Sequence, residues 1–383
     1  MIRTLTDEDR MIAEVAGELF VGHPVIPATD EPVARYDAAT WRHAAEVGLS
    51  ALAMPADLDG IEGFAALGEV LVAAGAALSP LPLVGSVVTA QQLIALSVAG
   101  EHRAALLGGL MAGTSIGTLV AGHRGGAVRV EARPGGPRLT GAVDAVPDGV
   151  TADLVLVTAA GPEGVTLYRI DPADAGFTAT RTRSVDLTRE YARVELAGCA
   201  AQPIPTHELA AALSRVEDLA TVARACEQLG AARRCLEMTT AHVRDRIQFG
   251  RALGSFQAVK HQCADLAVAL DDAESAVSHA IWASGESPES LPVAAAMAGA
   301  VCARVAYRAA DTAVHLHGGI GFTWEHPAHL YFRRAVSDTA VYGDENHFRE
   351  RFLAASGIPS PNASNDDPGP SPQRSPHQQG VTP

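Results

Sequence analysis

Two segments of the sequence concentrate residue types that can bind an anionic ligand. Arg244–His261 places several arginines around a Phe249-Gly250 step, and His315–Pro327 places histidines around Gly318-Gly319. A guanidinium group donates paired, charge-assisted hydrogen bonds to phosphate or carboxylate oxygens. Glycine lacks a Cβ, so backbone N–H groups beside it can approach such a ligand. Each motif alone also suits a plain helix end, and their joint occurrence is the stronger signal.

The charge and composition of the chain narrow the class of protein. A formal charge of −15 argues against nucleic-acid binding, and an anionic ligand must therefore meet local arginines. The five cysteines form no CxxC pair, so we expect free, buried thiols and no metal site. The N-terminus does not resemble a signal peptide, and no membrane-spanning stretch is expected. These features favour a soluble cytoplasmic protein.

The two motifs must be positioned by helices, because three-to-four apolar spacing dominates both ends of the chain. We predict an all-α domain over residues 1–112, with helices at Glu14–Phe20, Ala39–Leu49 and Phe64–Ala77, and a small antiparallel β domain over 113–204. A bundle of about four long helices follows over 205–356. Residues 357–383 are rich in Pro, Ser and Asn and are predicted to be disordered.

The two motifs, their order and the helical, β, helical layout resemble the acyl-CoA dehydrogenase family over roughly residues 5–356. The resemblance implies an α+β, three-domain fold and FAD bound at a subunit interface, so that this chain touches a neighbour's cofactor. It assigns Arg246 to the pyrophosphate, Phe249 and Leu253 to packing near the adenosine, and Gln257 to a polar contact. Backbone contacts are assigned to the glycine pair. The list of implied cofactor-binding residues is Arg246, Phe249, Leu253, Gln257, His315, Gly318 and Gly319.

The residue that should remove a proton from the substrate is not where the resemblance places it. Dehydrogenation of an acyl-CoA needs a carboxylate base, and counting from the glycine pair puts Tyr342 at that position. Some relatives carry the base on the helix before RxxFG, where counting back from Phe249 gives Ala220. A phenol with a pKa near 10 is a poor base and a methyl group is none. Three nearby carboxylates remain alternative bases, namely Glu217, Asp344 and Glu345.

The segments that should contact the chain's own flavin ring also depart from the family pattern. The expected Tyr-x-x-Thr-Glu-x-x-x-Gly-Ser-Asp stretch corresponds to Gly113–His123, which keeps only scattered Thr and Gly. An aromatic wall and a hydroxyl are replaced by Ala145 and Pro147. The pattern thus keeps what would serve a neighbour's flavin and lacks what would serve its own.

This asymmetry resembles the degenerate subunits of heteromeric bacterial acyl-CoA dehydrogenases. The leading hypothesis is a partner subunit in an α₂β₂ enzyme, completing an FAD site held by a paralogous catalytic chain. The resemblance further implies an acyl-CoA substrate, with steroid side-chain thioesters as a family-level expectation, and an electron-transferring flavoprotein as acceptor. A self-sufficient homo-oligomer using Glu217, Asp344 or Glu345 is the alternative, and a flavin-free scaffold or binding protein is a second.

Overall fold

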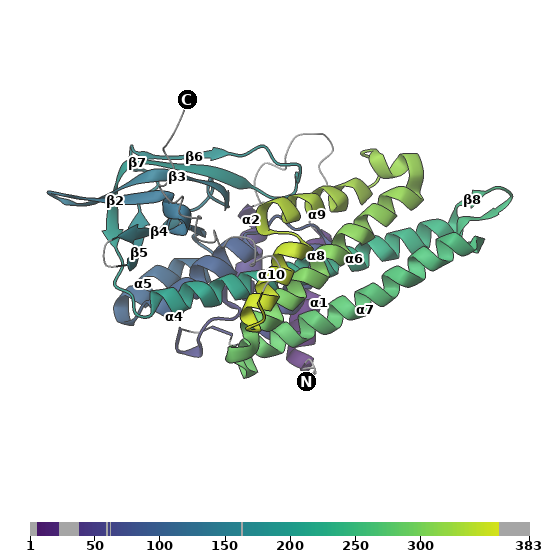
Figure 1. The fold of residues 1–383 in the computed structure, drawn as a ribbon, viewed down its shortest axis with the longest axis horizontal. Coiled ribbons are helices and arrows are strands. Elements are labelled where there is room, and N and C mark those ends of the chain that lie inside the picture. Colours follow the sequence, from purple (N-terminus) through teal and green to yellow (C-terminus); the bar gives the residue numbers. More distant parts are fainter. Residues whose placement is uncertain (1–5, 23–37, 59, 62, 162–163, 360–383) are drawn as a thin grey trace, which may run out of the picture.

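The computed structural model describes residues 6–22, 38–58, 60–61, 63–161 and 164–359. The predicted tail lies almost entirely outside these residues. Figure 1 shows an elongated molecule with the β-sheet at one end and long helices running to the other. The succession of helical, β and helical parts confirms the predicted fold class.

The N-terminal part is helical and packs against the C-terminal bundle. Its helices are α1 (Asp7–Gly22), α2 (Ala38–Glu46), α3 (Phe64–Ala76), a π-helix (Leu83–Gln91), α4 (Gln92–Ser97) and α5 (Gly100–Met111). The three predicted helices correspond to α1, α2 and α3. Their apolar faces share one core cluster with the bundle, which explains the three-to-four spacing in the sequence.

The central part is a sheet with the strand order β1-β4-β5-β7-β3-β2, in which β6 pairs with β7. Its strands are β1 (Gly117–Val120), β2 (Val128–Arg133), β3 (Gly136–Pro147), β4 (Leu154–Gly161), β5 (Gly164–Ile170), β6 (Phe177–Arg181) and β7 (Tyr191–Pro203). The prediction of a purely antiparallel domain was wrong, because β1 and β4 run parallel, Gly117 facing Leu154. In sequence, the antiparallel β2–β3 hairpin lies between these two parallel strands.

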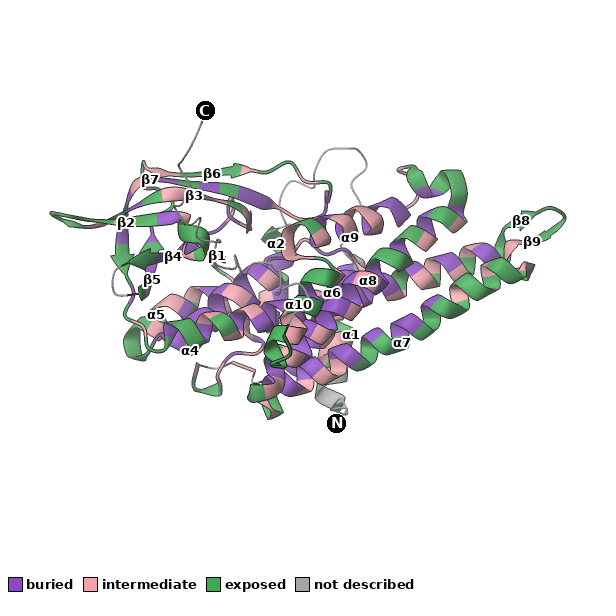
Figure 2. Ribbon diagram, viewed as in Figure 1, coloured by how far each residue is buried: buried purple, intermediate pink, exposed green. Residues whose placement is uncertain are grey.

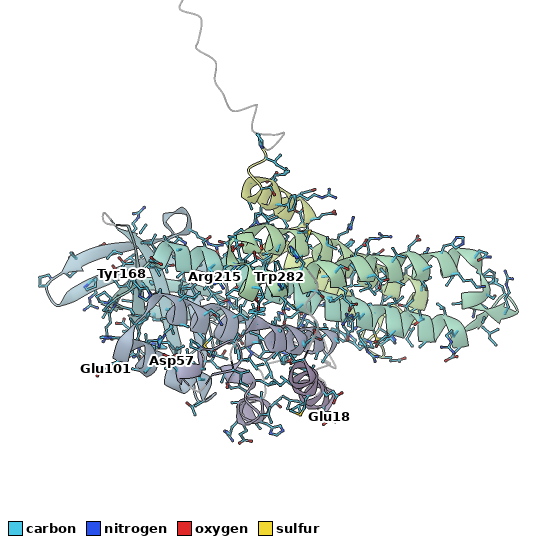
Figure 3. The ribbon with its side chains drawn as sticks, turned by 90° about the horizontal axis from the view of Figure 1, so that it is seen from below. Glu18, Asp57, Glu101, Tyr168, Arg215 and Trp282 are labelled. Carbon is cyan, nitrogen blue, oxygen red and sulfur yellow. The ribbon has the colours of Figure 1, made fainter. Side chains whose placement is uncertain are left out.

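The C-terminal part is a bundle of long helices. It contains α6 (Leu209–Asp245), the short hairpin β8 (Ile247–Gln248) and β9 (Arg251–Ala252), α7 (Gln257–Glu286), α8 (Leu291–His317), α9 (Ala328–Tyr342) and α10 (Glu345–Ala355). The helices are interrupted at the hairpin around Gly250, near Pro288 and at Gly318-Gly319. Figure 3 shows the molecule from below, with Arg215 of α6 beside the end of α7 that carries Trp282. Arg215 donates a hydrogen bond to the carbonyl of Ser284 there (2.8 Å).

Helix α8 lies at the centre of the bundle. The stretch Pro288–Phe322, which contains it, is long and apolar enough to cross a membrane, contrary to the expectation from sequence. Most of this stretch is buried inside the protein. In Figure 2 the buried residues of the α8 ribbon are purple. A long row of buried alanines allows α6, α7 and α10 to pack closely against it. Its composition is therefore that of a core helix.

Two glycines fix how α3 crosses α6. A Cβ on Gly75 would lie 1.9 Å from the carbonyl oxygen of Glu227, and a Cβ on Gly230 would lie 1.9 Å from that of Val72. Only glycine allows the two backbones to approach so closely. This crossing sets the position of the middle of α6, whose side chains line the cleft described next.

Candidate functional site

A cleft of about 690 Å³ lies between the sheet and the bundle. One wall carries Leu119, Ala121 and Pro147 from the β domain, and the other carries side chains of α6, α9 and α10. Walls of this kind, apolar with a few charged groups, are typical of small-molecule sites. The strand β3 reaches the cleft through a bulge between Val143 and Val146, where Ala145 adopts a φ of 54°.

Both positions that were counted for the base line this one cleft. Ala220 comes from the middle of α6, and Tyr342 comes from the end of α9, more than a hundred residues later. Two independent counts, made from different motifs, therefore meet in space. Neither side chain is a carboxylate, and burial raises the pKa of the Tyr342 phenol above its ordinary value. The phenol is therefore protonated at neutral pH.

Of the three alternative bases, only Glu217 lines the cleft. Its Oε2 lies 2.9 Å from Arg124 and its Oε1 lies 3.8 Å from Arg351, so both carboxylate oxygens face guanidinium groups. Asp344 instead accepts a hydrogen bond from the backbone N–H of His347 (2.9 Å) and caps α10. Glu345 forms ion pairs with Arg349 (2.6 Å) and Arg304 (3.8 Å) outside the cleft.

Sequence counting did not single out the cationic lining of the cleft. Arg124, Arg224 and Arg351 line it, whereas Glu217 is the one carboxylate among its described lining residues. Arg351 is also paired with the buried Asp218 (2.8 Å), and burial raises the pKa of that carboxyl to about 6. The arginines come from distant parts of the chain, so no local motif marks them. An excess of positive charge over apolar walls suits an amphipathic anion.

His123 also faces the cleft and is electrically neutral. Its Nδ1 lies 2.6 Å from the hydroxyl of Thr158, and burial together with nearby Arg124 lowers the pKa of the imidazole. It adds a polar group to the lining without adding charge at neutral pH.

The residues assigned to a neighbour's cofactor lie at the opposite end of the bundle. Arg246 ends α6, Phe249 is the tip of the β8–β9 hairpin, Leu253 follows it, and Gln257 begins α7 (Figure 1). Phe249 is 88% exposed and held at a φ of 56°, although its ring meets Phe256 edge-on. Figure 2 shows this end exposed. Such a large apolar side chain kept in solvent and in a strained backbone is typical of a contact surface.

His317, the residue before the glycine pair, lines a second cavity of about 590 Å³ together with Arg246. His317, which precedes Gly318, stacks between His242 of α6 and His326, with ring centroids 4.3 and 4.1 Å apart. This stack joins the end of α8 to α6, so both predicted motifs border one site. His315 is exposed, and a Cβ on Gly318 or Gly319 would lie in open space.

The described residues also include residue types that bind metals or form disulfides. No group of three or more His, Cys, Asp or Glu among them is placed to hold a metal ion. The five cysteines are free, and four of them are buried, with Cys263 half-buried.

Comparison with known proteins places this geometry in a family. The model of the acyl-CoA dehydrogenase C-terminal domain matches residues 210–356. The chain is 33% identical over 337 residues to acyl-CoA dehydrogenase IpdE2 of Mycobacterium tuberculosis, a match that covers 87% of this chain and 92% of that protein. The residues matched by the family model include the hairpin and the glycine pair.

Two solved structures are similar along nearly the whole chain. The crystal structure of the ChsE4-ChsE5 complex of Mycobacterium tuberculosis superposes with a TM-score of 0.82 and 28% identity, over 93% of this chain and 99% of that chain. The Tcur3481-Tcur3483 steroid ACAD superposes with a TM-score of 0.82 and 27% identity, over 92% and 99%. Each of these two names joins two different proteins.

Proposed function

Because this chain belongs to the acyl-CoA dehydrogenase family, we propose that it is the partner subunit of a heteromeric, FAD-dependent acyl-CoA dehydrogenase. In this role it completes an FAD site held mainly by a paralogous catalytic chain. The observation that carries the proposal is the cleft itself, in which Ala220 and Tyr342 occupy both counted base positions. The similarity to two-chain structures supports the same view.

The residues at the hairpin end fit an FAD contributed by a neighbour. The side chain of Arg246 is exposed, and its guanidinium group forms no hydrogen bond or ion pair with any part of the chain that the structure describes. A free guanidinium suits the pyrophosphate, because it donates two parallel charge-assisted hydrogen bonds. Phe249 and Leu253 offer apolar surface for an adenosine. Gly318 and Gly319 leave space where a side chain would block the backbone.

When bound, FAD supplies the acceptor for the electrons of acyl-CoA oxidation. The residues of this chain would bind and orient it: Arg246 would compensate the charge of the phosphates, and the β8–β9 hairpin would contact the cofactor. Proton removal then belongs to a carboxylate of the catalytic chain. We propose steroid-like CoA thioesters as the substrates and an electron-transferring flavoprotein as the acceptor. The similarity to the Tcur3481-Tcur3483 steroid ACAD supports the substrate class.

The proposal is tested by counting flavin. The chain is purified alone and together with the acyl-CoA dehydrogenase encoded beside it, and FAD per chain is measured from the visible absorbance. We expect a colourless lone chain and about one FAD per two chains in the complex, because each site would need one copy of each subunit. One FAD per lone chain would show that the chain holds its own cofactor, and colourless protein in every combination would favour a scaffold.

Substitution of Arg246 tests the residue that carries the charge. We expect Arg246→Ala in this chain to remove most FAD from the complex, because one charge-assisted contact contributes about 1.5–3 kcal/mol, or roughly 10- to 150-fold in affinity. Arg244→Ala is the matched control, since Arg244 is also exposed and lies two residues before Arg246. The circular-dichroism spectrum and Tm of the lone chain should not change in either variant. Equal flavin occupancy in the two variants would reject the role of Arg246.

A further inference from the structure

Arg224 is a half-buried cation without an anionic partner. It extends from α6 over the ring of Tyr342, with the guanidinium carbon 4.0 Å from the ring centroid. Its Nε is buried and has no hydrogen-bond partner within the described part of the chain, where the guanidinium also forms no ion pair. Burial lowers the pKa of Arg224, but an arginine still remains protonated at neutral pH.

The neighbouring buried arginine is satisfied in full, which makes Arg224 an exception. Arg189 lies 2.5 Å from Glu227 and 2.5 Å from Asp338, both within the same interior. Glu227 is only one helical turn from Arg224 but is occupied by Arg189. A charge removed from water is costly unless a partner compensates it. The protein thus supplies carboxylates to one buried arginine and leaves the other to something outside the chain.

Arg224 also lies at the end of the cleft, where it can contact one end of a bound ligand. It lines the 690 Å³ cleft and the small pocket of about 30 Å³ beneath it, so it lies at the cleft's inner end. The cleft walls near α6 are apolar, with Leu119, Val165 and Leu213 among them. On the pocket side, Glu227 is neutralised by Arg189, and burial raises the pKa of Asp148 to about 7. Two further carboxylates near the guanidinium are also paired, Glu190 with Arg181 and Asp338 with Arg189, so the carboxylates of the floor are already engaged by other arginines.

We propose that this cleft binds a ligand with an apolar body and a carboxylate, and that Arg224, stacked on Tyr342, receives the carboxylate. The planar guanidinium matches two carboxylate oxygens, and the ring beneath it holds the plane in place. A single unpaired guanidinium balances a monoanion, whereas a phosphate dianion would need further donors at the same point. The site does not require a catalytic base, so it is compatible with a cleft that lacks one.

Such a carboxylate could belong to an acyl-CoA whose acyl chain ends in a free carboxylate, or to a carboxylic acid that is not attached to CoA. We would titrate the full-length lone chain by calorimetry with glutaryl-CoA, with pentanoyl-CoA of the same acyl length, with free CoA and with glutarate. We expect glutaryl-CoA to bind at least 10-fold tighter than pentanoyl-CoA. Tight binding of glutarate alone would identify the free acid as sufficient.

Variants of Arg224 assign the difference to this residue. Arg224→Gln should abolish the preference for glutaryl-CoA over pentanoyl-CoA, while Arg224→Lys should retain part of that preference. Arg308→Gln, on the exposed face of α8, is the control. Thermal melting of each variant separates loss of the site from loss of the fold. If Arg224→Gln does not fold, the Arg224→Lys titration and the wild-type preference still decide.

Three results would overturn this inference. Equal affinity of the wild type for glutaryl-CoA and pentanoyl-CoA would show no carboxylate site. Binding of free CoA or inorganic phosphate that depends on Arg224 would show a phosphate site. Binding of FAD by the lone chain that is lost in Arg224→Gln would assign Arg224 to a flavin. None of these titrations requires turnover or the partner chain, so they are independent of the proposed subunit role.

Discussion

At the scale of single residues, the cleft contains several arginines but has no carboxylate at either counted base position. Ala220 and Tyr342 occupy the two counted base positions, and arginines line the same cleft. Glu217 is the carboxylate closest to the required place, and it is held between Arg124 and Arg351. A base must be free to accept a proton from the substrate, whereas this carboxylate is engaged in ion pairs. We therefore interpret Glu217 as part of the cleft wall.

Substitution of Glu217 distinguishes the two enzyme hypotheses. In the heteromeric complex, we expect Glu217→Gln to change turnover less than about 3-fold, because the catalytic chain supplies the base. In a self-sufficient enzyme the same change should reduce turnover by about 10²–10⁴. Asp344→Asn, which preserves the cap of α10, and Glu345→Gln serve as controls outside the cleft. Single-turnover absorbance changes of the complex provide the measurement.

At the scale of elements, the turn after β3 carries an unusual acid. Asp148 follows the β3 bulge at a φ of 55°, and its Oδ2 lies against Gly85 in the π-helix Leu83–Gln91. Burial is the largest cause that raises its pKa from 3.8 to about 7, and Glu190 raises it further. Only the absence of a side chain at position 85 leaves room for this contact. The turn thus connects the β domain to the N-terminal helices through the carboxyl of Asp148.

This acid predicts how stability varies with pH. Its folded pKa lies above its unfolded value, so its favourable contribution is complete below about pH 4 and is lost as pH rises through 7. Asp148→Asn should remove this term, because an amide does not ionise and Asn tolerates the left-handed backbone. Between pH 5 and pH 8 we expect the stability of the variant relative to wild type to increase by about 3 kcal/mol.

Denaturant unfolding of wild type and Asp148→Asn at pH 5, 6, 7 and 8 tests this expectation. The difference between the two proteins cancels the contributions of other titrating groups. Parallel stability profiles across the range would show that Asp148 titrates normally in the folded protein.

At the scale of the whole molecule, one buried ionic network joins the three parts of the chain. Arg189, between β6 and β7, binds Glu227 of α6 and Asp338 of α9. Arg334 of α9 donates to the hydroxyl of Thr188 (2.9 Å) and to the carbonyl of Leu78 beyond α3 (3.2 Å). The network lies beneath the cleft and holds its walls together. The position of the site thus depends on contacts among all three parts.

Breaking this network should destabilise the whole protein. Asp338→Ala leaves the buried Arg189 with one partner, which typically costs about 3–5 kcal/mol. Glu237→Ala is the control, because it removes only an exposed pair with Arg234, and surface pairs contribute about 0–1 kcal/mol. Calorimetric melting of the lone chain should show a clearly lower Tm for Asp338→Ala alone. Equal melting temperatures would mean that the network is not needed to join the three parts.

The sequence by itself determined the class of fold, the helix breaks and the family, because these follow from periodicity, glycine positions and motif order. Counting from the motifs also located Ala220 and Tyr342. Only the tertiary structure decided that these two residues share a cleft, that Glu217 is occupied by arginines, and that Arg224 lacks an anionic partner. It also decided that β1 and β4 are parallel. These features depend on segments far apart in the chain, and their pairing is set by packing that local patterns do not encode.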